Sequence, residues 1–108
     1  MCANSDDGNL HEVLNSCAWC QKKIHLEDEC YEVGARVVQG YDLSKKQGRA
    51  INIALVRSQR VVSAIVPMPG SQAARNSDIS FMLCSMECGL ALKQALNKEN
   101  AIIDRVNN

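Results

Sequence analysis

Aromatic residues are scarce in this chain: they make up 4% of its 108 residues. A core with so few rings must rest on valine, isoleucine, leucine and methionine, and a bound metal ion would add to its stability. No run of about 18 apolar residues occurs, so neither a transmembrane helix nor a membrane partner is expected. The polar, acidic start lacks the apolar stretch of a secretory signal, and we therefore expect a chain in the reducing cytoplasm.

Residue sets that carry out reactions are also missing from the sequence. It contains no Ser/His/Asp set, no glycine-rich phosphate loop and no paired acids at a spacing suited to acid–base chemistry. The acidic run 27–29 is typical of a solvated turn. We therefore predict that the protein is not an enzyme, and we infer no small-molecule substrate.

Acidic residues are nearly absent from the middle of the chain, although the net charge of the whole is zero. Residues 33–77 contain seven cations and one acid, a net charge of +6, whereas residues 1–32 carry −5. Within this basic block (36–75), six side chains could contact nucleic acid or a partner protein: Lys45, Lys46, Arg49, Arg57, Arg60 and Arg75. A sequence pI of about 6.7 is low for a dedicated nucleic-acid-binding domain, which favours ordinary solvent-facing cations.

Cysteines, in contrast, are plentiful: there are six, and four of them form the pairs Cys17/Cys20 and Cys84/Cys88. Two close pairs are the usual way for a chain to supply four thiolates to one Zn2+ ion. Four cysteine ligands would leave no position for water, so a zinc ion held here would be structural. In a reducing compartment this interpretation is favoured over disulfides.

Local patterns around the pairs predict an α+β fold. Residues 29–39 alternate as a strand does, with Gly34 at a bulge or bend and Cys30 as a small buried residue. The β-branched stretches 50–56 and 60–66 predict strands, either as a hairpin that turns at Ser58–Gln59 or as one long bent strand. Residues 71–77 are expected to form a loop. We predict a disordered leader at 1–9, with Cys2 as a free thiol, and a single zinc-binding domain at 10–108.

The second cysteine pair lies where a strand should give way to a helix. The apolar run 79–83 predicts the strand, Ser85 is suited to cap the helix, and Glu87 suits its first turn. The helix could extend to Arg105, or asparagines on the way could end it. Its apolar face would consist of Cys88, Leu92, Ala95, Leu96, Ile103 and Val106. Trp19 is expected to pack on this helix, and the methionines near its start are expected to fill the core.

The motifs Cys17-x2-Cys20-x-Lys22-x-Ile24 and Phe81-x-Leu83-Cys84-Ser85-x-Glu87-Cys88 resemble the treble-clef zinc fingers of the TRASH, MYM and FLZ groups. The similarity covers roughly residues 17–31 and 81–96. It implies that the matching cysteines bind zinc, and that the chain is a small treble-clef-like domain with a C-terminal helix. Members of these groups are associated with metal sensing or with protein contacts in regulatory complexes. Those fingers join their pairs through a short hairpin, whereas 63 residues (21–83) intervene in this chain.

Three functions fit these observations. The favoured one is a non-catalytic zinc module with an enlarged antiparallel hairpin that binds a protein partner, or a second copy through an exposed strand edge. The second is nucleic-acid binding through the basic block. The third is a metal sensor or carrier whose thiolates exchange a soft ion.

Overall fold

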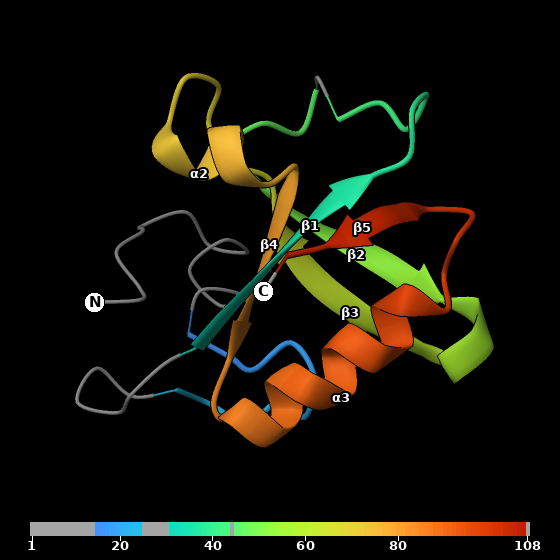
Figure 1. Ribbon diagram of the computed structural model, residues 1–108. Coiled ribbons are helices and arrows are strands. Elements are labelled where there is room, and N and C mark those ends of the chain that lie inside the picture. Colours follow the sequence, from blue (N-terminus) through green and yellow to red (C-terminus); the bar gives the residue numbers. More distant parts are fainter. Residues whose placement is uncertain (1–14, 25–30, 44, 108) are drawn as a thin grey trace.

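The fold is an antiparallel sheet with one long helix packed against it (Figure 1). This computed structural model describes residues 15–24, 31–43 and 45–107. In these residues the strands are ordered β2-β3-β4-β1-β5, and every pair is antiparallel. The predicted α+β class is thus confirmed, whereas the predicted leader 1–9, Cys2 and Cys30 lie outside the described residues. The strands are β1 (Tyr31–Val37), β2 (Ala50–Leu55), β3 (Arg60–Ile65), β4 (Ile79–Leu83) and β5 (Ile103–Val106).

Strands β2 and β3 form the enlarged central hairpin. Their pairing runs from Ala50 opposite Ile65 to Leu55 opposite Arg60. A 3-10 turn, η1 (Val56–Ser58), and then Gln59 in the left-handed region at φ 55° reverse the chain. The stretch is therefore a hairpin and not one long bent strand, and its β-branched composition suits both strands.

Strand β4 lies at the centre of the sheet, between β3 and β1, and all five of its residues are buried. Its continuous apolar run is typical of a strand covered on both faces. Phe81 is the largest of the fully buried side chains. The rest of the core consists mainly of aliphatic side chains, as the scarcity of rings requires: Val33, Ile53, Leu55, Val62, Ile79, Leu83, Leu92, Leu96 and Ile103.

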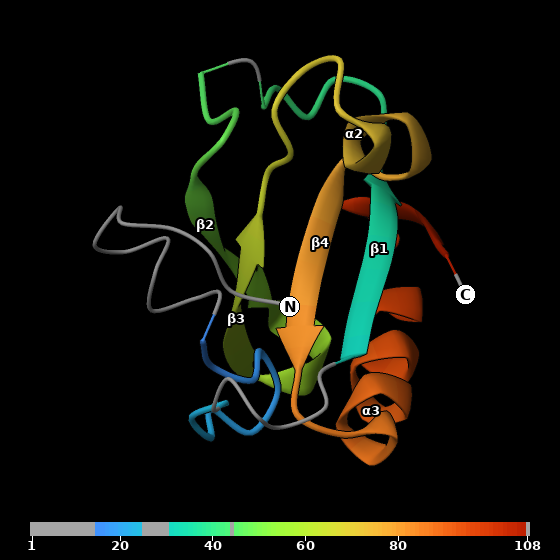
Figure 2. The same ribbon diagram turned by 90° about the vertical axis from the view of Figure 1, so that its left-hand side faces the viewer.

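Helix α3 (Met86–Asn97) packs against β1, β4 and β5 (Figure 2). The Ser85 side chain caps it, as predicted, but it stops well short of Arg105. The carbonyl of Glu99 accepts from the N–H groups of Ile102 and Ile103, and the chain then turns back as β5. The prediction that Ile103 and Val106 belong to the helix is wrong, because pairing with β1 takes them into the sheet. No helix in the described part of the chain is long and apolar enough to cross a membrane.

Two further predictions need correction. Residues 72–76, expected as loop, form the short helix α2 (Gln72–Asn76), for which the Ser71 hydroxyl accepts the Ala74 N–H at 3.2 Å. Of the two alternatives for Gly34, a bulge is wrong, since Gly34 pairs in regular register with Ser80 of β4 and the irregularity of β1 lies between Arg36 and Val37, opposite β5. Position 34 favours glycine because a Cβ there would collide with the side chain of Ser77, which would have to shift.

Candidate metal centre

The first cysteine pair lies on a tight turn, the knuckle (residues 16–23), whose ends are joined by a β-bridge. The Cys17 N–H donates to the carbonyl of Lys22 at 2.8 Å, and the Gln21 N–H donates to the carbonyl of Cys17 at 2.9 Å. Gln21 adopts φ 65°, which allows this reversal. The Cys20 N–H then points at the sulfur of Cys17, 3.5 Å away. The turn thereby brings both thiols to the same side.

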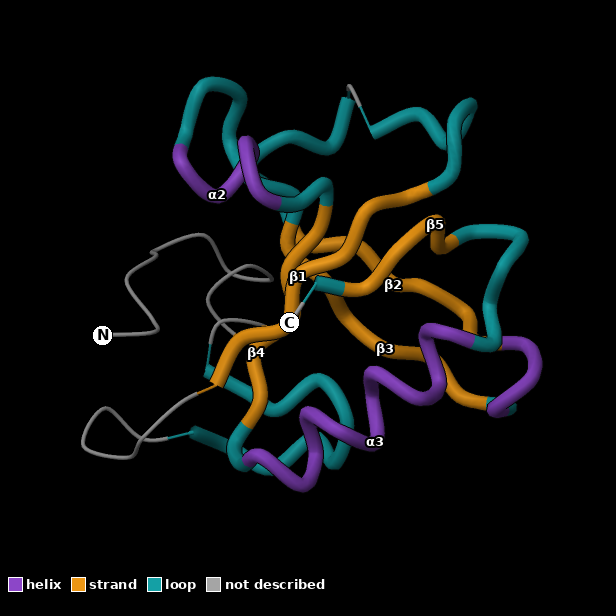
Figure 3. The backbone as a smooth tube through the Cα atoms, viewed as in Figure 1, coloured by secondary structure: helices purple, strands orange, loops and turns teal. Residues whose placement is uncertain are grey.

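The second pair is positioned by the end of β4 and the first turn of α3. Cys84 follows the last residue of β4, and Cys88 donates its N–H to the Ser85 hydroxyl at 3.2 Å. The knuckle is fastened to the same strand, because the Ala18 N–H donates to the carbonyl of Met82 at 2.7 Å. The backbone trace shows the knuckle lying beside the start of α3 (Figure 3).

The four sulfur atoms meet between these elements, as the spacing of the pairs predicts. All of them lie within 4.8 Å of one another, with 3.6 Å between Cys20 and Cys84 and 3.8 Å between Cys84 and Cys88. A tetrahedral zinc ion with Zn–S bonds near 2.3 Å needs sulfurs about 3.8 Å apart. The cluster of Cys17, Cys20, Cys84 and Cys88 could therefore hold a metal ion.

The four thiols differ in their exposure to solvent. Cys17 is buried, Cys84 and Cys88 are half-buried, and Cys20 is exposed. Burial opposes ionisation of Cys17, but hydrogen bonds from the backbone of Cys20, Cys84 and Trp19 lower its pKa to about 7. Burial and the neighbouring Cys20 thiol raise the pKa of Cys84 to about 12. An ion at this centre would thus find one thiol that ionises readily near neutral pH and would have to displace a proton from another.

An arginine from the central hairpin supports the knuckle, a contact that no sequence pattern predicted. The guanidinium of Arg60 lies over the ring of Trp19, 3.8 Å from its centroid, and donates to the Trp19 carbonyl at 3.0 Å. Trp19 itself is half-buried and packs against the core. The tryptophan thus has a cationic neighbour on β3, a contact beyond the predicted packing on the helix.

The structure separates the six cations that the sequence singled out. All of them are exposed, but Lys45, Lys46 and Arg49 precede β2, whereas Arg57 and Arg60 lie at the far end of the hairpin. The six residues of β2 separate the two groups by roughly 20 Å. Arg75 lies on α2, where its carbonyl accepts a hydrogen bond from Arg36. The cations therefore form no continuous patch on the hairpin.

No protein-family model matches the chain, and no curated protein or solved structure matches it either. The resemblance to treble-clef fingers therefore rests on the cysteine motifs alone.

The Met86 side chain is 65% exposed, although it was predicted to fill the core.

Proposed function

We propose that this protein is a non-catalytic module in which a structural zinc ion is held by Cys17, Cys20, Cys84 and Cys88, and that the module binds another protein. The observation that carries the proposal is the convergence of four sulfurs within 4.8 Å of one another, close enough to share one tetrahedral ion. Four protein ligands would fill the coordination shell, and such closed sites are structural. The ion would join the knuckle to the start of α3.

Exposed apolar side chains support a protein partner. Val56 is 73% and Val61 is 54% exposed at the end of the β2–β3 hairpin, and Met86 and Leu90 are exposed one turn apart on α3. Scattered apolar residues are normal on a protein surface, but these gather at two places. Nucleic-acid binding gains less support, because the cations are divided between the two ends of the hairpin and Arg60 is engaged by Trp19.

Elemental analysis of the purified chain tests the metal centre. About one zinc per chain is expected, with loss of the metal in a Cys84→Ser variant. Cys2→Ser is the matched control, since it removes a thiol that the proposal leaves out of the centre, and it should keep its zinc. A wild-type chain that is folded, reduced and free of metal would disprove the metal centre.

Crosslinking tests the class of partner. A photoreactive amino acid at Val56 in the zinc-loaded protein should give adducts of increased mass that nuclease leaves unchanged and in which mass spectrometry finds peptides of a second protein. The same group at Arg49 serves as the comparison, because phosphate contacts would be made by the cations on that side of the hairpin. Nuclease-sensitive adducts at position 49 that weaken steeply with salt would favour nucleic acid instead.

A further inference from the structure

The two edges of the sheet are protected to very different degrees. Strand β5 at one edge is four residues long, carries the exposed Asp104 and Arg105, and is irregularly paired with its neighbour. Short length, charges and bulges are the devices that keep a sheet edge from pairing with another chain. Strand β2 at the other edge has six residues, Ala50–Leu55, with no charge and no proline among them. Of the two edges, β2 is therefore the one suited to accept a further strand.

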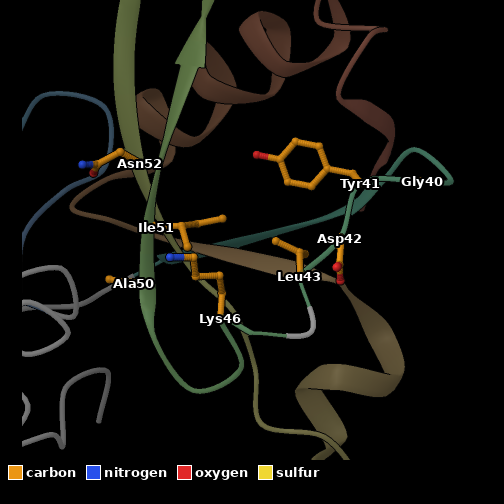
Figure 4. A pocket seen from close by; sticks show the side chains of 8 residues that line it. All are labelled: Gly40, Tyr41, Asp42, Leu43, Lys46, Ala50, Ile51 and Asn52. Atoms are coloured by element: carbon orange, nitrogen blue, oxygen red, sulfur yellow. The ribbon is translucent and has the colours of Figure 1, made fainter.

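A cleft of about 570 Å3 borders the first half of this edge (Figure 4). Residues 50–52 form one wall, and residues 40–43 with Lys46 form the other. The Tyr41 ring and the Lys46 side chain both point from the loop toward the strand (Figure 4). A groove between an edge strand and a second wall is the arrangement in which extended peptides add to a sheet.

Charge decides which strand could occupy the edge. Lys46 and Arg49 lie before β2 and Arg57 lies after it, and all three are exposed. If two copies paired antiparallel through β2, the Lys46–Arg49 end of one would meet the Arg57 end of the other. Parallel pairing would place like ends together, so either arrangement opposes like charges, which is unfavourable. A second copy is thus disfavoured as the occupant.

Building on the proposed function, we propose that β2 is the docking edge for an extended segment of a partner protein. This segment carries acidic residues on both sides of an uncharged stretch about as long as β2. Its backbone would pair with the outward N–H and C=O groups of β2, while its acids would lie near Lys46 and Arg49 at one end and Arg57 at the other. Cations outnumber acids at both ends of the edge, so the charges would suit either strand direction. Lys46 and Arg49 lie with Asp42 at one end. Arg57 and Arg60 lie with Glu99 at the other.

Synthetic peptides with an alternating valine/threonine core test this docking edge on the zinc-loaded protein. One carries glutamates at both ends, a second carries lysines there, and a third has glutamates but N-methyl groups on alternate core amides. Titration calorimetry and amide NMR shifts should detect binding of the first alone, with the shifts concentrated in 50–55 and 40–43. The double variant Lys46→Glu/Arg49→Glu should weaken binding roughly tenfold or more. Arg105→Glu on β5 is the matched control and should leave the affinity unchanged.

Three results would overturn the docking edge. These are no binding by any peptide, equal binding by the N-methylated peptide, and self-association in sedimentation accompanied by shifts in β2 without peptide. Zinc content is measured on the same samples. If the zinc-loaded protein crosslinks to proteins through Val56 but binds none of the peptides, only the docking edge is contradicted. If the folded chain contains no zinc, the proposed function is contradicted.

Discussion

Replacing Arg60 by methionine should weaken the metal centre from outside its ligand set. Arg60 lies on β3 and is not one of the four cysteines. Its guanidinium stacks on Trp19, which lies between Cys17 and Cys20 in the sequence. The same guanidinium donates to the Trp19 carbonyl at 3.0 Å. Methionine keeps much of the aliphatic stem but removes both interactions. The knuckle should then be less well fixed when it binds the ion.

The size of the effect follows from these two contacts. An exposed cation–π interaction contributes about 0.5–1 kcal/mol, and a hydrogen bond contributes about 0.5–1.5 kcal/mol. Because Arg60 is exposed, we expect the two contributions together to amount to about 1–2 kcal/mol, below the sum of their two upper limits. If the contacts are made fully only in the metal-bound knuckle, zinc affinity should fall about five- to thirtyfold. Arg60→Lys should recover part of this loss, since it keeps the charge without the planar fork.

Competition with a chromophoric chelator measures the affinity, and the fluorescence of Trp19, the one tryptophan of the chain, reports the contact directly. Arg57→Met is the matched control, because Arg57 donates to the Glu99 carboxylate through its backbone N–H, and this contact remains in the variant. Equal zinc affinity in Arg60→Met and wild type would refute the reasoning. An equal loss in both methionine variants would refute it as well, because the effect would then be one of net charge.

Three other predictions concern the glycine of β1, the helix cap and the thiol protons. Gly34→Ala should lower the free energy of unfolding by about 1–3 kcal/mol in urea denaturation, because its Cβ would collide with Ser77. Ser85→Ala should lower it by about 0.5–2 kcal/mol, because the Cys88 N–H loses its acceptor. Apparent zinc affinity should fall at least about tenfold for each unit of decreasing pH below neutrality, because the pKa of Cys84, about 12, leaves a proton for the ion to displace.

Each of the three has a result that would contradict it. Gly89→Ala is the control for the first prediction. A Cβ at position 89 would lie 3.4 Å from Leu83, which is an acceptable contact. In a helix interior alanine is more stable than glycine by about 0.5–1 kcal/mol. Equal destabilisation by both alanines would dismiss steric crowding at position 34. Ser85→Thr should largely preserve the cap, so a loss as great as that of alanine would argue against it. Zinc affinity that is independent of pH in chelator competition would exclude proton displacement.

The elements nearest the cysteine pairs could be predicted because their local signals agree. The uninterrupted apolar run at Ile79–Leu83 and the cap residue Ser85 define the end of β4 and the start of α3. The convergence of Cys17, Cys20, Cys84 and Cys88 could likewise be predicted from their spacing, since two close pairs are typical of zinc sites. In both cases the information lies within a few consecutive residues, which is where sequence patterns are most reliable.

Features that depend on distant contacts could not be predicted. Ile103 and Val106 have a spacing compatible with a helix, and only pairing with β1 makes them a strand. The preference for glycine at position 34 depends on Ser77, which is far away along the chain. The stacking of Arg60 on Trp19 required the hairpin to place β3 beside the knuckle. Nothing in the sequence around Arg60 distinguishes it from the other exposed cations.

The long segment between the two cysteine pairs, residues 21–83, affects the kinetics of folding. Cys20 and Cys84 are 64 positions apart, and in the folded chain the pairing of β4 with β1 and the hydrogen bond from Ala18 to Met82 bring their sulfurs together. Sheets built from such remote pairings fold slowly, and contacts formed after the transition state do not accelerate folding. If the four sulfurs come together after the transition state, an ion at this centre would act chiefly by slowing unfolding. The metal would set the lifetime of the folded chain and not the speed at which it forms.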